Sequence, residues 1–191
     1  MGLAGSLYQA GEGSDYEECL MWAQKSIDQG CADGYWPLAL AYHHGRGVEE
    51  NIEKAIEYYK KGADGGNAKC QHNLGCEYMT GEFLEKDTHK AFDLIKASAE
   101  QGYGLAMADL GRCYQFAFGT TGNMKKAVEW YEKSLEVNYD PELERKTQVF
   151  KSILEELPEE GEDYPEFEGD FDFSDPMAGV DLSGLFSEDE K

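Results

Sequence analysis

The chain of 191 residues carries a formal net charge of −22, because 39 acidic side chains stand against only 17 lysines and arginines. A field of this sign repels nucleic-acid phosphates and anionic membranes, so neither is expected as a partner, and it favours a basic protein. Hydrophobic residues make up 41% of the chain, which is enough for one folded domain with its own core.

Residues 1–14 are expected to form an N-terminal extension. They lack the basic start and the long apolar run of a secretory signal. No stretch of the chain is apolar for long enough to cross a bilayer. The chain has an odd number of cysteines and no CxxC pair, which is typical of free thiols in a reducing compartment. The sequence therefore predicts a soluble cytoplasmic protein.

Beyond this extension the chain repeats itself every 36 residues. Three blocks, 32–67, 68–103 and 104–139, align without a gap, and a half-repeat precedes them, so the array is expected to cover residues 15–139. The recurring positions are Leu38/Leu74/Leu110, Tyr42/Tyr78/Tyr114, Lys54/Lys90/Lys126 and Asp15/Asn51/Asp87/Asn123.

Each block contains two helical patterns, which we name helix A and helix B. Helix A carries the Leu-x-x-x-Tyr motif and ends in a glycine loop. Helix B begins at the Asp/Asn position, because a short polar side chain there caps a helix N-terminus. Glycine recurs where helix B ends, as at Gly66 and Gly102, and marks the seam between two repeats.

The stretches "AEQGYGLAMADLG", "GNAKCQHNLGCEYMTGE", "YHHGRGVEENIEKAIEYYKKGA" and "NMKKAVEWYEKS" resemble Sel1-like repeats, a longer-period relative of the tetratricopeptide repeat. The resemblance implies an all-α, right-handed α-solenoid of about 3.5 helix-turn-helix repeats that binds other proteins. It offers no catalytic residue to transfer. The third block departs from the pattern, because "FAFGTT" replaces the Gly-x-Gly-Val loop, and this turn is expected to be built differently.

Differences between the repeats indicate which face of helix A is free. The similar positions, among them the leucine and tyrosine columns, fall on one arc and predict the buried stripe. Most of the variable positions fall on the opposite arc, which we expect to line the concave, partner-binding groove. The groove candidates are Trp36, Leu40, His44, His72, Glu77, Arg112 and Phe116, with His43 and Gln115 at the margin.

The sequence contains no specific catalytic or metal-binding motif. His72 and Cys76 lie four residues apart on one helical face, with Cys70 and His89 nearby, but a structural zinc site requires four ligands with recognisable spacing. Neither a GxSxG elbow nor a phosphate-binding GxxxxGK[ST] motif is present. No enzyme activity, no metal and no cofactor are therefore expected.

The array is followed by two further segments. Residues 140–157 predict a capping helix, with Asp140 as its cap and Pro141 at its first position. Residues 158–191 are acidic and are expected to be disordered. In this tail apolar side chains alternate with or interrupt the acids, which indicates a short binding motif. Its members are Tyr164, Phe167, Phe171, Phe173, Leu182, Leu185 and Phe186.

Taken together, the sequence predicts a monomeric, non-enzymatic adaptor that binds a basic protein or peptide. The alternative is an acidic inhibitor or immunity-type protein that neutralises a basic enzyme or toxin, which predicts tight one-to-one binding that salt weakens. A hydrolase in the groove, or a metal-binding protein that uses His72 and Cys76, is the least favoured class.

Overall fold

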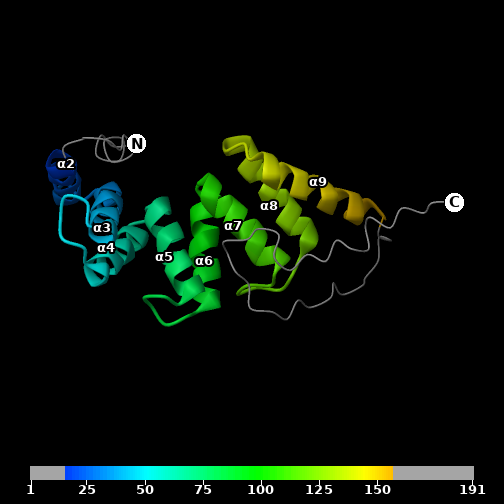
Figure 1. Cartoon of the computed structure of the whole chain (residues 1–191), viewed down its shortest axis with the longest axis horizontal. Coiled ribbons are helices and arrows are strands. Elements are labelled where there is room, and N and C mark those ends of the chain that lie inside the picture. Colours follow the sequence, from blue (N-terminus) through cyan, green and yellow to red (C-terminus); the bar gives the residue numbers. More distant parts are fainter. Residues whose placement is uncertain (1–15, 157–191) are drawn as a thin grey trace.

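The computed structural model describes residues 16–156, so the predictions for the extension and the acidic tail lie outside the described residues. The described part is all helical, with helix pairs that follow one another along the long axis (Figure 1). Its elements are α2 (Tyr16–Asp28), η1 (Ala32–Gly34), α3 (Tyr35–His44), α4 (Ile52–Asp64), α5 (Ala68–Thr80), α6 (Thr88–Glu100), α7 (Gly104–Gln115), α8 (Met124–Val137) and α9 (Pro141–Glu156). None of these helices is long and apolar enough to cross a membrane.

The start of helix B is capped as predicted in each complete repeat. The side-chain oxygen of the capping residue accepts a hydrogen bond from the backbone N–H three residues later, at 2.9 to 3.0 Å (Asn51, Asp87 and Asn123). Each bond satisfies one of the amides that a helix leaves without an internal partner. Asp15, the fourth member of this column, lies outside the described residues.

The seam glycines also take the predicted conformation. Gly30, Gly66 and Gly102 have φ angles of 80°, 82° and 88°, in the left-handed region that suits glycine. At the next position of this column Asn138 has an extended backbone, with φ of −133°. The chain therefore leaves the path of the repeat there and enters α9.

The turn from helix A to helix B is nearly the same in all three repeats, which corrects the expectation for "FAFGTT". In each turn the capping residue donates its backbone N–H to the tyrosine carbonyl, at 2.8 to 2.9 Å (Tyr42, Tyr78 and Tyr114). Gly45 and Gly81 have φ of 62° and 75°, and Ala117 takes the same left-handed conformation at 57°. The third turn thus keeps the backbone of the others with a non-glycine residue in the strained position.

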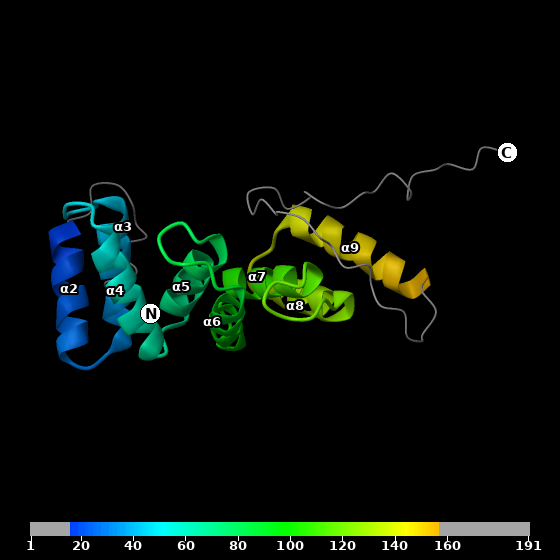
Figure 2. The same cartoon turned by 90° about the horizontal axis from the view of Figure 1, so that it is seen from below.

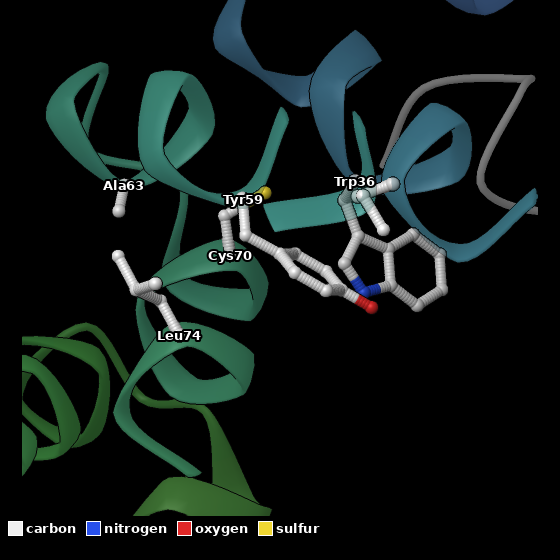
Figure 3. Packing of buried hydrophobic residues seen from close by; sticks show 7 residues of the cluster. Trp36, Tyr59, Ala63, Cys70 and Leu74 are labelled. Carbon is white, nitrogen blue, oxygen red and sulfur yellow. The ribbon is translucent and has the colours of Figure 1, made fainter. Parts of the chain in front are cut away.

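The core is a row of clusters, each shared by neighbouring helices. The leucine column is buried as predicted, and the small column beside it allows close approach: a Cβ on Gly111 would lie 2.6 Å from the Tyr131 ring. Figure 3 shows the cluster shared by the first two complete repeats, in which Trp36 lies beside Tyr59, and Cys70 and Leu74 come from α5.

The two columns that recur most clearly contact each other. In every complete repeat the lysine of helix B places its ammonium over the half-buried tyrosine ring of helix A, 5.1 to 5.4 Å from its centroid (Lys54–Tyr42, Lys90–Tyr78 and Lys126–Tyr114). This cation–π contact joins the two helices of one repeat, which explains why the tyrosine and the lysine recur together.

The final helix begins at Pro141, as predicted, and Asp140 Oδ1 accepts the backbone N–H of Glu142 at 2.9 Å. It packs on α8 at the end of the array (Figures 1 and 2). Its apolar face is centred on Phe150, which is 3% exposed and lies in one cluster with Tyr131. The predicted capping helix is therefore present, and its apolar face is used inside the protein.

Candidate functional site

The seven groove candidates come from the three A helices, α3, α5 and α7, or from the residue that follows α7. Four of them are accessible: His44 is exposed, and three are partly exposed (Leu40, Glu77 and Arg112). The other three are each only 8% exposed (Trp36, His72 and Phe116). The structure therefore divides the predicted set into a surface group and a supporting group.

The two aromatic candidates are packed by different neighbours: Trp36 by the following repeat, and Phe116 by its own turn and by α9. Trp36 belongs to the core cluster of the first complete repeat, and the Lys69 ammonium of the next A helix lies 3.9 Å above its ring. Phe116 lies beside Phe118, with ring centroids 5.9 Å apart. Their residue types suit an interface, but so little of either ring is exposed that a partner would find mainly an edge.

A buried cation lies near the end of the array. Lys146 on α9 is 6% exposed, and its ammonium lies 5.3 to 5.7 Å from the ring centroids of Phe116, Tyr131 and Phe150. Burial and the positive charge of Arg112 lower the pKa of Lys146 to about 8. The rings offset part of the cost of burying this charge.

His72 connects two successive A helices. Its Nε2 lies 2.6 Å from Asp109 Oδ2 on α7 and 3.6 Å from Cys76 Sγ, one turn further along α5. Arg112 Nη2 contacts the other carboxylate oxygen, Asp109 Oδ1, at 3.0 Å. The ring of Tyr103 packs edge-on against the imidazole, with centroids 5.3 Å apart. These residues form the His72 cluster, which contains two groove candidates, His72 and Arg112.

The protonation of His72 follows from these contacts. Burial lowers the pKa of the imidazole, but the hydrogen bonds with Asp109 and Cys76 raise it by more than burial lowers it. The pKa of His72 is therefore raised, to about 10. His72 therefore carries a proton at neutral pH and forms a buried ion pair with Asp109.

This arrangement differs from a cysteine hydrolase triad. In such a triad the histidine uses one nitrogen for the nucleophile and the other for the orienting carboxylate. Here Cys76 and Asp109 both approach Nε2, while His72 Nδ1 is buried without a hydrogen-bond partner in the described part of the chain. The geometry does not provide the general base that nucleophilic catalysis by Cys76 would require.

A second group of side chains, three polar and one aromatic, lies where α3 and α5 end, and we name it the His43 corner (His43, His44, Glu77 and Phe83). The His43 ring meets His44 at 4.7 Å and the edge of Phe83 at 5.9 Å between centroids. Phe83 is 40% exposed. Burial raises the pKa of Glu77, and the nearby charge of His43 lowers it. Burial is the larger effect, so the pKa of Glu77 is raised overall.

Glu77 Oε2 is the unusual atom of this corner. It is buried, yet it has no hydrogen-bond partner among the described residues. A buried acceptor left without a partner is costly and is rare in folded proteins. Glu77 as a whole is only partly buried, so a rotation of its side chain would bring this oxygen to the surface, where a donor from another molecule could satisfy it.

Two residues that matter here were not among the candidates. Asp109 occupies a column that holds Pro37 and Asn73 in the other repeats, so no pattern marked it. Phe83 stands where the other repeats have Gly47 and Gly119. An exposed aromatic residue in a glycine column is a signal that the alignment of the repeats could have given.

Two comparisons with known proteins, with family models and with solved structures, support the fold. The family model of the Sel1 repeat matches residues 1–31, 32–67, 68–103 and 104–139. The last three matches have the block boundaries found in the sequence, and the first includes residues 1–14. None of the curated proteins with which the chain was compared matches it.

Several solved structures share the fold. A Sel1 repeat protein from Oxalobacter formigenes is 29% identical, with a TM-score of 0.62 over 68% of this chain and 97% of that one. The protective antigen c5321 of uropathogenic Escherichia coli is also 29% identical, with a TM-score of 0.60 over 71% of this chain and 29% of that one. Cysteine rich protein B of Helicobacter pylori shows the fold at 19% identity, with a TM-score of 0.54 over 70% of this chain and 95% of that one.

Proteins built from these repeats act generally as protein-interaction scaffolds and are typically not enzymes. The period, the caps, the seam glycines and the family match agree along the array. The chain belongs to the Sel1 repeat family.

Proposed function

We propose that this chain is a non-enzymatic adaptor that binds a partner protein or peptide on the exposed surface of its A helices. The observation that carries the proposal is the His43 corner, where Glu77 Oε2 has no hydrogen-bond partner among residues 16–156 and the exposed ring of Phe83 lies against His43. A lysine or arginine of a partner would satisfy the carboxylate, and an apolar neighbour of that residue would cover the ring.

The charge of the chain supports the same class of partner. The net charge of −22 attracts basic proteins and speeds their encounter with the surface. Three other groove candidates are accessible for contacts with the same partner (Leu40, His44 and Arg112). None of the five cysteines, all of which lie within residues 16–156, forms a disulfide, which is consistent with work in a reducing compartment such as the cytoplasm.

The first test is affinity purification with the full chain and its Glu77→Gln variant. Loss of a charge-assisted hydrogen bond costs about 1.5–3 kcal/mol, so the variant should bind its partner about 10–100-fold more weakly. Phe83→Ala should weaken binding as well. The matched control is Glu53→Gln, because Glu53 is exposed on the B helix α4.

Stability separates a binding role of Glu77 from a structural one. Because the raised pKa means that the folded protein disfavours the charged carboxylate, Glu77→Gln is expected to keep or raise the melting temperature. A variant that binds less and melts no earlier supports the proposal. A partner that all these variants bind equally well contradicts it.

The tail and the inhibitor alternative are tested with the purified partner. Deleting residues 158–191 measures the contribution of the acidic-aromatic tail. Calorimetric titrations at low and high salt then compare the two functions, since the inhibitor alternative predicts one tight, salt-sensitive complex and an adaptor is expected to bind several weaker partners.

A further inference from the structure

We infer that His72, Cys76 and Asp109 form a binding site for a divalent transition-metal ion of the zinc type. The inference does not depend on the proposed function. The three side chains offer a nitrogen, a sulfur and an oxygen atom that all lie within 4.8 Å of one another. The ion would take the place of the proton on His72 Nε2 and of the thiol proton of Cys76, and both protons would be released to the solvent. These donors are the ligand types that proteins use for zinc.

The local geometry matches one edge of the coordination polyhedron of such an ion, and small movements would complete it. With bond lengths of about 2.0 to 2.3 Å, two ligand atoms on a tetrahedral zinc ion lie about 3.3 to 3.6 Å apart. The separation of His72 Nε2 and Cys76 Sγ is 3.6 Å, which already matches one edge of the tetrahedron. His72 Nε2 and Asp109 Oδ2, at 2.6 Å, must separate by less than ~1 Å to make room for the ion.

The first two ligands are fixed by helical spacing, and the third by the stacking of the repeats. His72 and Cys76 lie one turn apart on α5 and therefore on the same face. Asp109 lies on α7, the A helix of the following repeat. A metal ion here would join two repeats, and this arrangement explains why a search for ligand spacing along the sequence found only a pair.

The cluster belongs to a single place in the array. At the positions equivalent to His72 and Cys76, the preceding repeat has Trp36 and Leu40, and the following repeat has Ala108 and Arg112. No other group of at least three histidine, cysteine or acidic side chains in residues 16–156 comes close enough to hold an ion. The donors are therefore a local departure from the repeat pattern and do not follow from the fold.

The neighbours of Asp109 set the orientation of this third ligand and the charge around it. Arg112 holds Asp109 Oδ1 at 3.0 Å, which leaves Oδ2 directed at His72. Such outer contacts fix the orientation of a ligand. The positive charge of Arg112 opposes a cation, and the net charge of −22 favours one. Cys76 and Asp109 are only partly buried, so an ion can enter and a water molecule can take the fourth position.

The test uses the full chain, reduced, purified without a histidine tag and dialysed against Zn²⁺ in excess Ca²⁺. Calcium occupies all-oxygen sites made by the many carboxylates, so the zinc that remains reports a site with nitrogen or sulfur ligands. We expect one zinc ion per chain by elemental analysis. Co²⁺ in its place should give the thiolate charge-transfer band of a cobalt–sulfur bond.

Variants assign the ligands. Cys76→Ser should abolish the charge-transfer band, and Asp109→Asn should weaken zinc binding about tenfold or more. The matched control is Cys31→Ser, because Cys31 is an exposed free thiol outside the cluster. Circular dichroism of each variant confirms that the helices are intact.

Three results would overturn the inference. They are a protein without stoichiometric zinc after dialysis, a cobalt–sulfur band that survives in Cys76→Ser, and a band that disappears in Cys31→Ser. If Asp109→Asn fails to fold, Cys76→Ser still decides the outcome, because Cys76 is only partly buried and the substitution keeps its size.

Discussion

Replacing Ala117 with glycine is expected to stabilise the protein. Ala117 has φ of 57° in the turn between α7 and α8, a conformation in which a side chain is strained. The two equivalent turns use Gly45 and Gly81 there, with φ of 62° and 75°. The chain therefore contains two internal references for the same turn.

The magnitude follows from the three turns together. A non-glycine residue in the left-handed region destabilises the folded state by about 1–2 kcal/mol, and a glycine removes this strain. Part of this gain in stability is lost, because a glycine also makes the unfolded chain more flexible. Ala117→Gly should therefore add about 1 kcal/mol, or about 3 °C in melting temperature. Gly45→Ala and Gly81→Ala should each lose a similar amount.

The two reverse substitutions should differ in size. A Cβ on Gly81 would lie 2.9 Å from the Cβ of Lys86, whereas a Cβ on Gly45 has its nearest neighbour, the Cβ of Glu50, at 3.4 Å. Gly81→Ala should thus be the more damaging of the two. Thermal and urea denaturation measure all three variants. An Ala117→Gly protein that is less stable than the wild type, beside a harmless Gly45→Ala, would refute the reasoning.

Three further substitutions test charge and packing. His72 has a folded pKa of about 10, above its ordinary value of about 6.5. The His72–Asp109 pair therefore contributes fully to the free energy of unfolding below pH ~6.5, and this contribution is lost as the pH rises toward ~10. In urea denaturation, the free energy of unfolding of Asp109→Asn should not show this decrease with pH. Lys146, with its pKa lowered to about 8, has the opposite sign: stability should rise between pH ~8 and ~10.4, and Lys146→Met should abolish the rise in the same assay. An unchanged pH profile in either variant would contradict its assignment. Gly111→Ala should cost about 1–3 kcal/mol in thermal denaturation, because the added Cβ would meet the Tyr131 ring at 2.6 Å, and a cost near zero would show that the ring can move aside.

The repeat made much of the fold predictable. The same residue types recur at the same position of each block, so their structural role could be inferred from the sequence. This holds for the caps at Asn51 and Asn123, the left-handed Gly102 and the buried leucine column. The turn at Ala117 was misjudged, because its sequence differs while its hydrogen bonds do not. Backbone geometry in a repeat is held by all of its neighbours, and one unfavourable residue does not change it.

The candidate surface was predicted less well. A helical wheel separates a helix into an inner and an outer face, but it does not show which neighbouring elements cover that outer face. Trp36 is covered by the following repeat, and Phe116 by its own turn and by α9, so both are buried although they lie in variable columns. The contact between His72 and Asp109 joins α5 and α7 of successive repeats, and no spacing within one helix can reveal it.

The last helix closes one end of the stack of repeats. A stack of similar repeats has matching surfaces at its two ends, and head-to-tail association of such ends produces open filaments. α9 does not follow the repeat, and it covers α8 with a face centred on Phe150. The end at which another repeat could have joined is thus closed by a differently shaped surface. A helix that adds nothing to the repeat count thus occupies the surface of α8 on which a further repeat would stack.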